Sequence, residues 1–172
     1  MIQKVFTFII LFSSFPIHDC AESKVKVENA FIDFVNFSYV DEQTFHFSFK
    51  NESETKSSIS LRIDIIKDIP EDFHVKVKIM GRTFGQYTLP TGVNVDVKFC
   101  QSSLNDFFQP YMNAAGITTC PPTKGTYESN DISTEVVGMP VSLIPGLHFL
   151  VEFETYASDI VLSKARYYIY VS

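Results

Sequence analysis

Apolar and polar side chains alternate along most of the chain after its first twenty residues. In segment 45–50, phenylalanine alternates with histidine, serine and lysine. Because successive side chains of a β-strand point to opposite faces, this pattern predicts a strand with one buried and one solvated face. The same alternation recurs in segments 61–65, 75–79, 93–99, 147–155 and 160–171, and segment 25–39 is expected to supply one or two further strands.

Turn-forming residues separate these strands at short intervals. The expected turns are segments 51–58, 81–82, 89–92 and 144–146, which combine glycine, proline and polar residues. About seven to nine short strands at this spacing favour a β-sandwich over βαβ units. No repeat, low-complexity tract or linker indicates a second domain, so residues 21–172 are expected to form one all-β, antiparallel domain.

One segment has helical spacing instead. Its apolar stripe consists of Leu104, Phe107, Phe108, Tyr111, Met112 and Ala115. Ser102 or Ser103 is suited to cap the start of the helix, and Gly116 is suited to end it. Pro110 lies inside the stripe and is expected to limit the helix to about two turns or to kink it.

The N-terminus has the layout of a secretory signal peptide. A short basic start at Lys4 precedes the apolar run 5–12. A helix that spans a bilayer needs about 20 apolar residues, whereas Pro16 and its polar neighbours interrupt this run. We therefore expect residues 1–20 to be cleaved and the mature protein to be secreted and extracellular.

Cleavage near Cys20 would leave Cys100 and Cys120 as the remaining cysteines. An even number of cysteines in an oxidising compartment favours a disulfide over a metal site or a reactive thiol. Since these two residues closely bracket the expected helix, we predict that they are bonded and hold the helix over one end of the sandwich. Asn36 and Asn51 head Asn-x-Ser tripeptides, which are acceptors for N-glycosylation in secreted proteins.

Charge and motif content exclude several functions. The net charge of −6 and the low pI argue against a nucleic-acid partner. The mature chain keeps His46, His74 and His148, and we interpret them as solvent-facing strand residues. The sequence contains no nucleophile elbow, zinc-protease motif or phosphate-binding glycine loop. We therefore predict no catalytic residues, no metal and no cofactor.

Aromatic residues are the most informative part of the composition. Of the 17 phenylalanines, four lie in the predicted signal peptide, which leaves 13 beside eight tyrosines and no tryptophan. This set can fill a core, or it can line a pocket between two sheets. The candidate pocket-lining residues are Phe45, Phe47, Phe49, Val95, Val97, Phe99, Phe107, Phe108, Tyr111, Phe149, Val151 and Phe153.

The C-terminal half carries a more specific pattern. Its elements are the Cys-Pro and Lys-Gly-Thr-Tyr of segment 120–127, the Met-Pro at 139–140, and the Ile-Pro-Gly at 144–146 that leads into strand 147–152. In this order and spacing, the chain resembles the ML lipid-recognition family over about residues 93–171, especially its ganglioside activator branch. It is also similar to the CheB-type chemosensory proteins of insects, including the Phe-Cys before a short helix.

This resemblance implies a secreted, immunoglobulin-like β-sandwich with a hydrophobic pocket between its sheets. Members of the family bind lipids, sterols, glycolipids or pheromone-like molecules and present or transfer them unchanged. By position, Cys100 and Cys120 match family cysteines around the helix, and segment 104–112 matches a region near the pocket mouth. The family's early cysteine is missing, and segment 163–166 replaces the cysteine of its last strand, so the ligand class does not follow from the resemblance.

Three interpretations follow. The first is a non-enzymatic carrier of a lipid or hydrophobic small molecule, with a membrane receptor or a membrane surface as a transient partner. Its chemosensory version depends on the CheB-type similarity alone. The second is a secreted interaction module whose sandwich is fully packed and whose surface binds another protein. The third, an enzyme, lacks a motif to support it, and a cavity would distinguish the first from the second.

Overall fold

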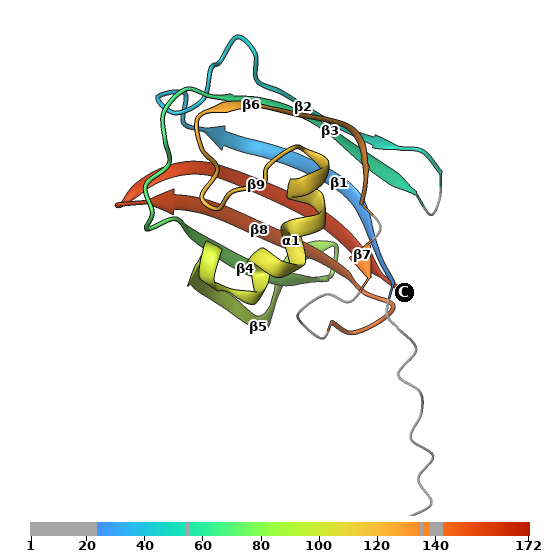
Figure 1. Cartoon of the computed structure of the whole chain (residues 1–172). Helices are drawn as coiled ribbons and strands as arrows, with labels where there is room; N and C mark the ends of the chain where they lie inside the picture. Colours follow the sequence, from blue (N-terminus) through green and yellow to red (C-terminus); the bar gives the residue numbers. More distant parts are fainter. Residues whose placement is uncertain (1–23, 54–55, 135, 138–142) are drawn as a thin grey trace, which may run out of the picture.

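The computed structural model describes residues 24–53, 56–134, 136–137 and 143–172 of the chain. The predicted signal peptide lies outside the described residues. Two antiparallel sheets pack face to face, and helix α1 (Ser103–Ala114) runs across the front of the sandwich in Figure 1. The strands are β1 (Lys24–Val35), β2 (His46–Asn51), β3 (Ser57–Ile65), β4 (His74–Thr83), β5 (Gln86–Lys98), β6 (Gly125–Ser133), β7 (Val136–Val137), β8 (His148–Ala157) and β9 (Ile160–Val171).

The larger sheet has the strand order β5-β4-β8-β9-β1-β7, and the smaller sheet has the order β2-β3-β6. Neighbouring strands pair antiparallel throughout both sheets. The all-β antiparallel sandwich predicted from the sequence is therefore confirmed. The first and last described strands, β1 and β9, lie side by side and close the chain into one unit.

The period-2 pattern produces the two faces of the larger sheet. On β4, Val75, Val77 and Ile79 are buried on the inner face, while Lys76 and Lys78 are exposed on the outer face. The inner face of β8 continues this core, which also takes in residues of β1 and β9. Burial of these aliphatic side chains is the main stabilising contribution that the sequence pattern encodes.

Strand β1 has a largely open edge. Its pairing with β7 covers only Lys24 and Val25, and the rest of that edge has no strand partner among the described residues. Its opposite edge pairs with β9, with register shifts between Val27 and Asn29 and beyond Ile32. In the smaller sheet, β2 is likewise an edge strand, so two open edges face each other across the sandwich.

The turns expected at segments 81–82 and 89–92 are wrong. The first segment lies in β4 and the second in β5. The chain reverses instead at Phe84 and Gly85, whose φ angles are +48° and +82°. Such positive φ angles at both central residues are typical of a two-residue hairpin loop. The glycine at position 92 serves a bulge in β5, where extra residues are inserted opposite Ile79. Phenylalanine is an unusual residue for this loop, which is why the turn was not predicted there.

The predicted helix and disulfide are present. A short 3-10 turn, Phe99–Gln101, leads into α1, and Cys100 is bonded to Cys120 with 5.4 Å between their Cα atoms. Gly116, with φ of +79°, follows the helix and ends it. The helix has 12 residues despite Pro110, so it is longer than the two turns expected. Ser102 occupies the capping position, but its hydroxyl donates to the carbonyl oxygen of Phe99 at 2.8 Å.

Candidate ligand-binding site

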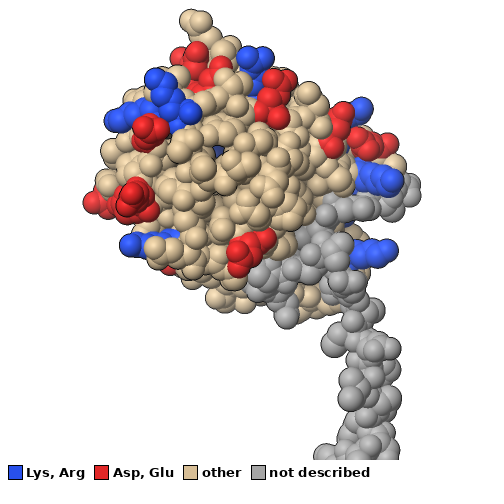
Figure 2. Space-filling model, in the orientation of Figure 1, with Lys and Arg blue, Asp and Glu red and all other residues tan. Residues whose placement is uncertain are grey.

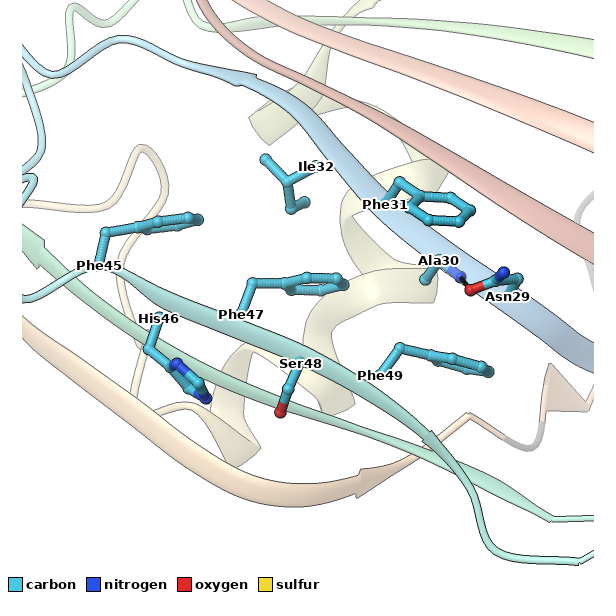
Figure 3. Close-up of a pocket in the computed structure, with 9 residues that line it drawn as sticks. All are labelled: Asn29, Ala30, Phe31, Ile32, Phe45, His46, Phe47, Ser48 and Phe49. Carbon is cyan, nitrogen blue, oxygen red and sulfur yellow. Dashed lines mark hydrogen bonds between the residues drawn. The ribbon is translucent and has the colours of Figure 1, made fainter.

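A groove with a row of three phenylalanines lies between the open edges of β1 and β2, with a volume of about 570 Å³ (Figure 3). Pockets for small molecules commonly measure about 300–1,000 Å³, so the groove is large enough for a ligand of that kind. It is open to solvent along its length. Its lining residues are Asn29, Ala30, Phe31, Ile32, Phe45, His46, Phe47, Ser48 and Phe49.

Three phenylalanines, one just before β2 and two on it, form one wall of the groove. Phe45, Phe47 and Phe49 extend to the same side of the strand in Figure 3, while His46 and Ser48 point to the other side. This separation follows directly from the two-residue period of a strand. All three phenylalanines pack against the core and remain half-buried, so each keeps part of its ring available to a ligand.

Polar contacts tie the two sheets together at one end of the groove. The side-chain amide of Asn51 donates to the carbonyl oxygen of Glu28 at 3.2 Å. The hydroxyl of Ser57 donates to the carbonyl oxygen of Val27 at 2.8 Å. Both acceptors belong to the β1 edge, and these two bonds replace strand pairing there. We call this pair of contacts the seam clamp.

An aromatic contact marks the other end of the groove. The ring of Phe37 meets the ring of Phe45 edge to face, with 6.2 Å between the centroids. Phe37 itself is largely exposed. The groove therefore runs from the seam clamp to this ring pair, along the row of phenylalanines on β2.

The groove wall contains no charged side chain among the residues that line it. A second hollow, of about 320 Å³ on the outer face of the larger sheet, is lined largely by lysine, arginine and acidic residues. Those charges compensate one another: Arg166 donates to both carboxylate oxygens of Asp33 and holds the pKa of that carboxyl below its usual range. Likewise, the hydrogen bond from Lys164 lowers the pKa of Glu154. The outer hollow is thus an ion-paired sheet face, whereas no lysine, arginine, aspartate or glutamate lines the groove.

Aromatic rings also gather beneath helix α1. Phe108 meets Phe153 edge to face at 5.7 Å and lies 6.3 Å from Phe99. Phe153 in turn meets Tyr167 at 5.4 Å, and Phe99 meets Phe73 at 5.6 Å. These contacts attach the helix to the inner face of β8 and β9. We call the five residues the interior aromatic cluster.

Tyr167 connects this cluster to the groove. It lies on the inner face of β9, directly between Val151 of β8 and the groove residue Ala30 of β1. Burial raises the pKa of the Tyr167 phenol. The side chain nevertheless keeps some accessible surface. Tyr167 itself is not among the residues that line the groove, but its strand neighbour Ala30 is.

The structure places the predicted pocket residues in four settings. In the first setting, Phe45, Phe47 and Phe49 line the groove together. Phe108 and Phe153 belong to the interior aromatic cluster, and Phe107 and Tyr111 are half-buried on α1 beside it. Val95 and Val97 are half-buried on the edge strand β5. Phe99, which also belongs to the cluster, is buried in the core with Phe149 and Val151.

Sequence reasoning missed the β1 side of the groove and Tyr167. The bulges of β1 break its period, so no alternation identified Ala30 and Ile32 as inward-facing. Tyr167 does lie in the apolar phase of β9 with Ala165 and Ile169. This alternation with Ala165 and Ile169 was the sequence feature that could have identified Tyr167 as an inward-facing residue.

The histidines take part in surface contacts. His46 is exposed, and His148 lies 2.8 Å from a carboxylate oxygen of Glu28. His74 lies 3.3 Å from Asp96, which accepts a hydrogen bond from Tyr156 at 2.8 Å. This bond raises the pKa of the Tyr156 phenol to about 12. His74 and His148 are not among the residues that line the groove, whereas His46 on β2 is.

Among the residues that the structure describes, no three His, Cys, Asp or Glu side chains are grouped so that they could hold a metal ion. Within the same residues, no helix has the length and apolar character needed to cross a membrane. No protein-family model matches the chain, and a search of curated proteins finds no match to it.

Proposed function

We propose that this protein is a secreted, non-enzymatic carrier that binds a lipid or another hydrophobic small molecule between its two sheets. The groove between β1 and β2 is the entrance to the site. The observation that carries the proposal is a row of three half-buried phenylalanines facing an uncharged groove of about 570 Å³. The resemblance to ML proteins adds support, and a chemosensory role depends on the CheB-type similarity alone.

The energetics of such binding are favourable for a long hydrocarbon chain. Each buried methylene contributes about 0.8 kcal/mol, so about twelve would contribute roughly 10 kcal/mol. Association costs about 4–15 kcal/mol, and the cost is lowest when the site is already formed. Strands β1 and β2 hold the groove residues in place without a ligand, which keeps this cost low.

The uncharged surface around α1 suits the same role. Segment 107–123 contains no charged residue. Figure 2 shows a broad face on which charges lie mainly toward the rim, with a small opening near its middle. An uncharged surface near the ligand site would favour brief contact with a membrane or a receptor during loading, as we propose for the transient partner.

A second candidate function is protein binding at the open edge of β1. Phe31, Phe34 and Phe37 keep between 42% and 44% of their surface exposed along and just beyond this strand. An extended peptide can add to an open strand edge through main-chain hydrogen bonds, with side-chain pockets giving specificity. In this case the groove would hold side chains of a partner and not a small molecule.

The test is uptake of the neutral fluorescent probe N-phenyl-1-naphthylamine by the purified mature protein, together with native mass spectrometry for co-purified lipid. We expect saturable binding that Phe47→Asp weakens more than 10-fold, because the bound probe would cover the carboxylate and remove its hydration. The matched control is Ser48→Asp, one residue along β2 on the opposite side. Circular dichroism verifies that both variants fold.

Failure of the wild-type protein to take up the probe, with no lipid in the native spectrum, would overturn the carrier proposal. Equal effects of Phe47→Asp and Ser48→Asp would place the bound probe outside the groove. Generic ester substrates should remain intact in the presence of the protein, and turnover would contradict the non-enzymatic role.

A further inference from the structure

Tyr167 occupies the centre of the inner face of the larger sheet. Its cross-strand neighbours, Ala30 and Val151, are buried, with 5% and 3% of their surface exposed. Its ring meets Phe153 edge to face. A phenol is therefore placed among apolar side chains, next to Ala30, which lines the groove.

The hydroxyl of Tyr167 has no hydrogen-bond partner among the described residues, and burial alone accounts for the shift of its pKa. Two other tyrosines differ. Tyr127 donates to the carbonyl oxygen of Thr123 at 2.8 Å, and Tyr156 donates to Asp96. The Tyr167 hydroxyl is not among the fully buried side-chain atoms that lack a partner, so it keeps accessible surface that a ligand can reach. A hydroxyl without a partner among the described residues is a donor that a ligand can satisfy.

The polarity of the groove restricts that ligand further. Among its lining residues the polar ones are Asn29, His46 and Ser48, and the last two point away from the phenylalanine row. The nearest arginine on the neighbouring strand face, Arg166, is already bonded to Asp33. No cation in the described lining is available to a carboxylate or phosphate, and burial of an unpaired charge is strongly unfavourable.

We propose that the hydroxyl of Tyr167 donates a hydrogen bond to a neutral oxygen of the bound ligand, and that this ligand carries no net charge. The inference depends on the proposed carrier function and names its ligand class. Long-chain ketones, aldehydes, esters and alcohols belong to this class. Fatty-acid anions and phospholipid head groups do not.

The experiment compares three ligands of similar length, 2-tridecanone, tridecane and dodecanoate, by displacement of N-phenyl-1-naphthylamine at pH 8. The wild-type protein should prefer the ketone to both the alkane and the anion. Tyr167→Phe removes only the hydroxyl and should weaken ketone binding roughly 3- to 10-fold, the range of one hydrogen bond, while alkane binding is unchanged. Tyr168→Phe is the matched control, since Tyr168 is the next residue of β9 and lies on the opposite face.

A second measurement separates ligand recognition from a structural role. Thermal unfolding of the empty Tyr167→Phe protein should occur at the wild-type temperature or above it, because the variant removes an unpaired hydroxyl. A clear drop in this temperature would show that the hydroxyl already has a partner, and would overturn the proposal.

The outcomes distinguish this inference from the carrier function. If the ketone and the alkane bind equally well, or if dodecanoate binds as tightly as the ketone, the role of Tyr167 is overturned and the carrier function stands. If Tyr167→Phe leaves ketone affinity unchanged, the role of Tyr167 is likewise overturned and the carrier function stands. If none of the three ligands displaces the probe and the probe itself does not bind, both proposals fall.

Discussion

At the residue scale, Phe84 is held in a backbone conformation that its side chain disfavours. It lies at the tip of the β4–β5 hairpin with φ of +48°, and its side chain is fully exposed. A left-handed conformation places the Cβ atom of an L-residue too close to the following carbonyl oxygen, which costs roughly 1–2 kcal/mol. The ring has no burial to offset this cost.

We expect Phe84→Asn to stabilise the protein by about 1 kcal/mol, because asparagine tolerates this conformation and Asn-Gly is a preferred hairpin pair. The measurement is the free energy of unfolding from urea titration. Phe84→Ala is the control, since it removes the exposed ring but keeps an L-residue with a Cβ atom at the strained position. Equal stability of the two variants would contradict the strain argument.

At the element scale, α1 depends on two different attachments. The Cys100–Cys120 bond closes the chain at the two ends of the helical segment, and Phe108 anchors the middle of the helix to Phe153 and Phe99. The helix has no fully buried residue of its own. Its position over the interior aromatic cluster therefore depends on these contacts, and an unattached helix of 12 residues would be marginal in water.

Removing the disulfide in the Cys100→Ala/Cys120→Ala variant should destabilise the fold by about 3 kcal/mol, from the loop-closure entropy of a 20-residue separation. Urea titration gives the free energy of unfolding, and hydrogen exchange of α1 amides shows whether the loss begins at the helix. The control is wild-type protein reduced under native conditions, which should match the variant. A change below about 1 kcal/mol would show that packing of Phe108 suffices to hold the helix.

At the scale of the whole molecule, the sequence predicts what is local and misses what depends on pairing between distant strands. The alternation in segment 45–50 predicts Phe45, Phe47 and Phe49 on one face, and the structure keeps them together on the groove. Their partners across the groove come from β1, about 15 residues earlier, and nothing in the sequence indicates which edges face each other. Tyr167 was missed for the same reason, since its place beside Ala30 is set by the pairing of the first and last described strands.

The seam clamp gives the whole sandwich one fixed end and one open side, and this arrangement leads to a kinetic prediction. The amide of Asn51 spans from the end of β2 to the carbonyl oxygen of Glu28. In protein produced without glycosylation, Asn51→Ala should lower the free energy of unfolding by about 1 kcal/mol, the net value of one hydrogen bond. Because the open edges could then separate more easily, uptake and release of N-phenyl-1-naphthylamine should both accelerate, with little change in Kd.

Stopped-flow fluorescence measures both rates, and Lys50→Ala, an exposed neighbour on the same strand, is the control. Unchanged rates in Asn51→Ala would show that the ligand enters elsewhere, for example beside α1, and that the clamp is purely structural.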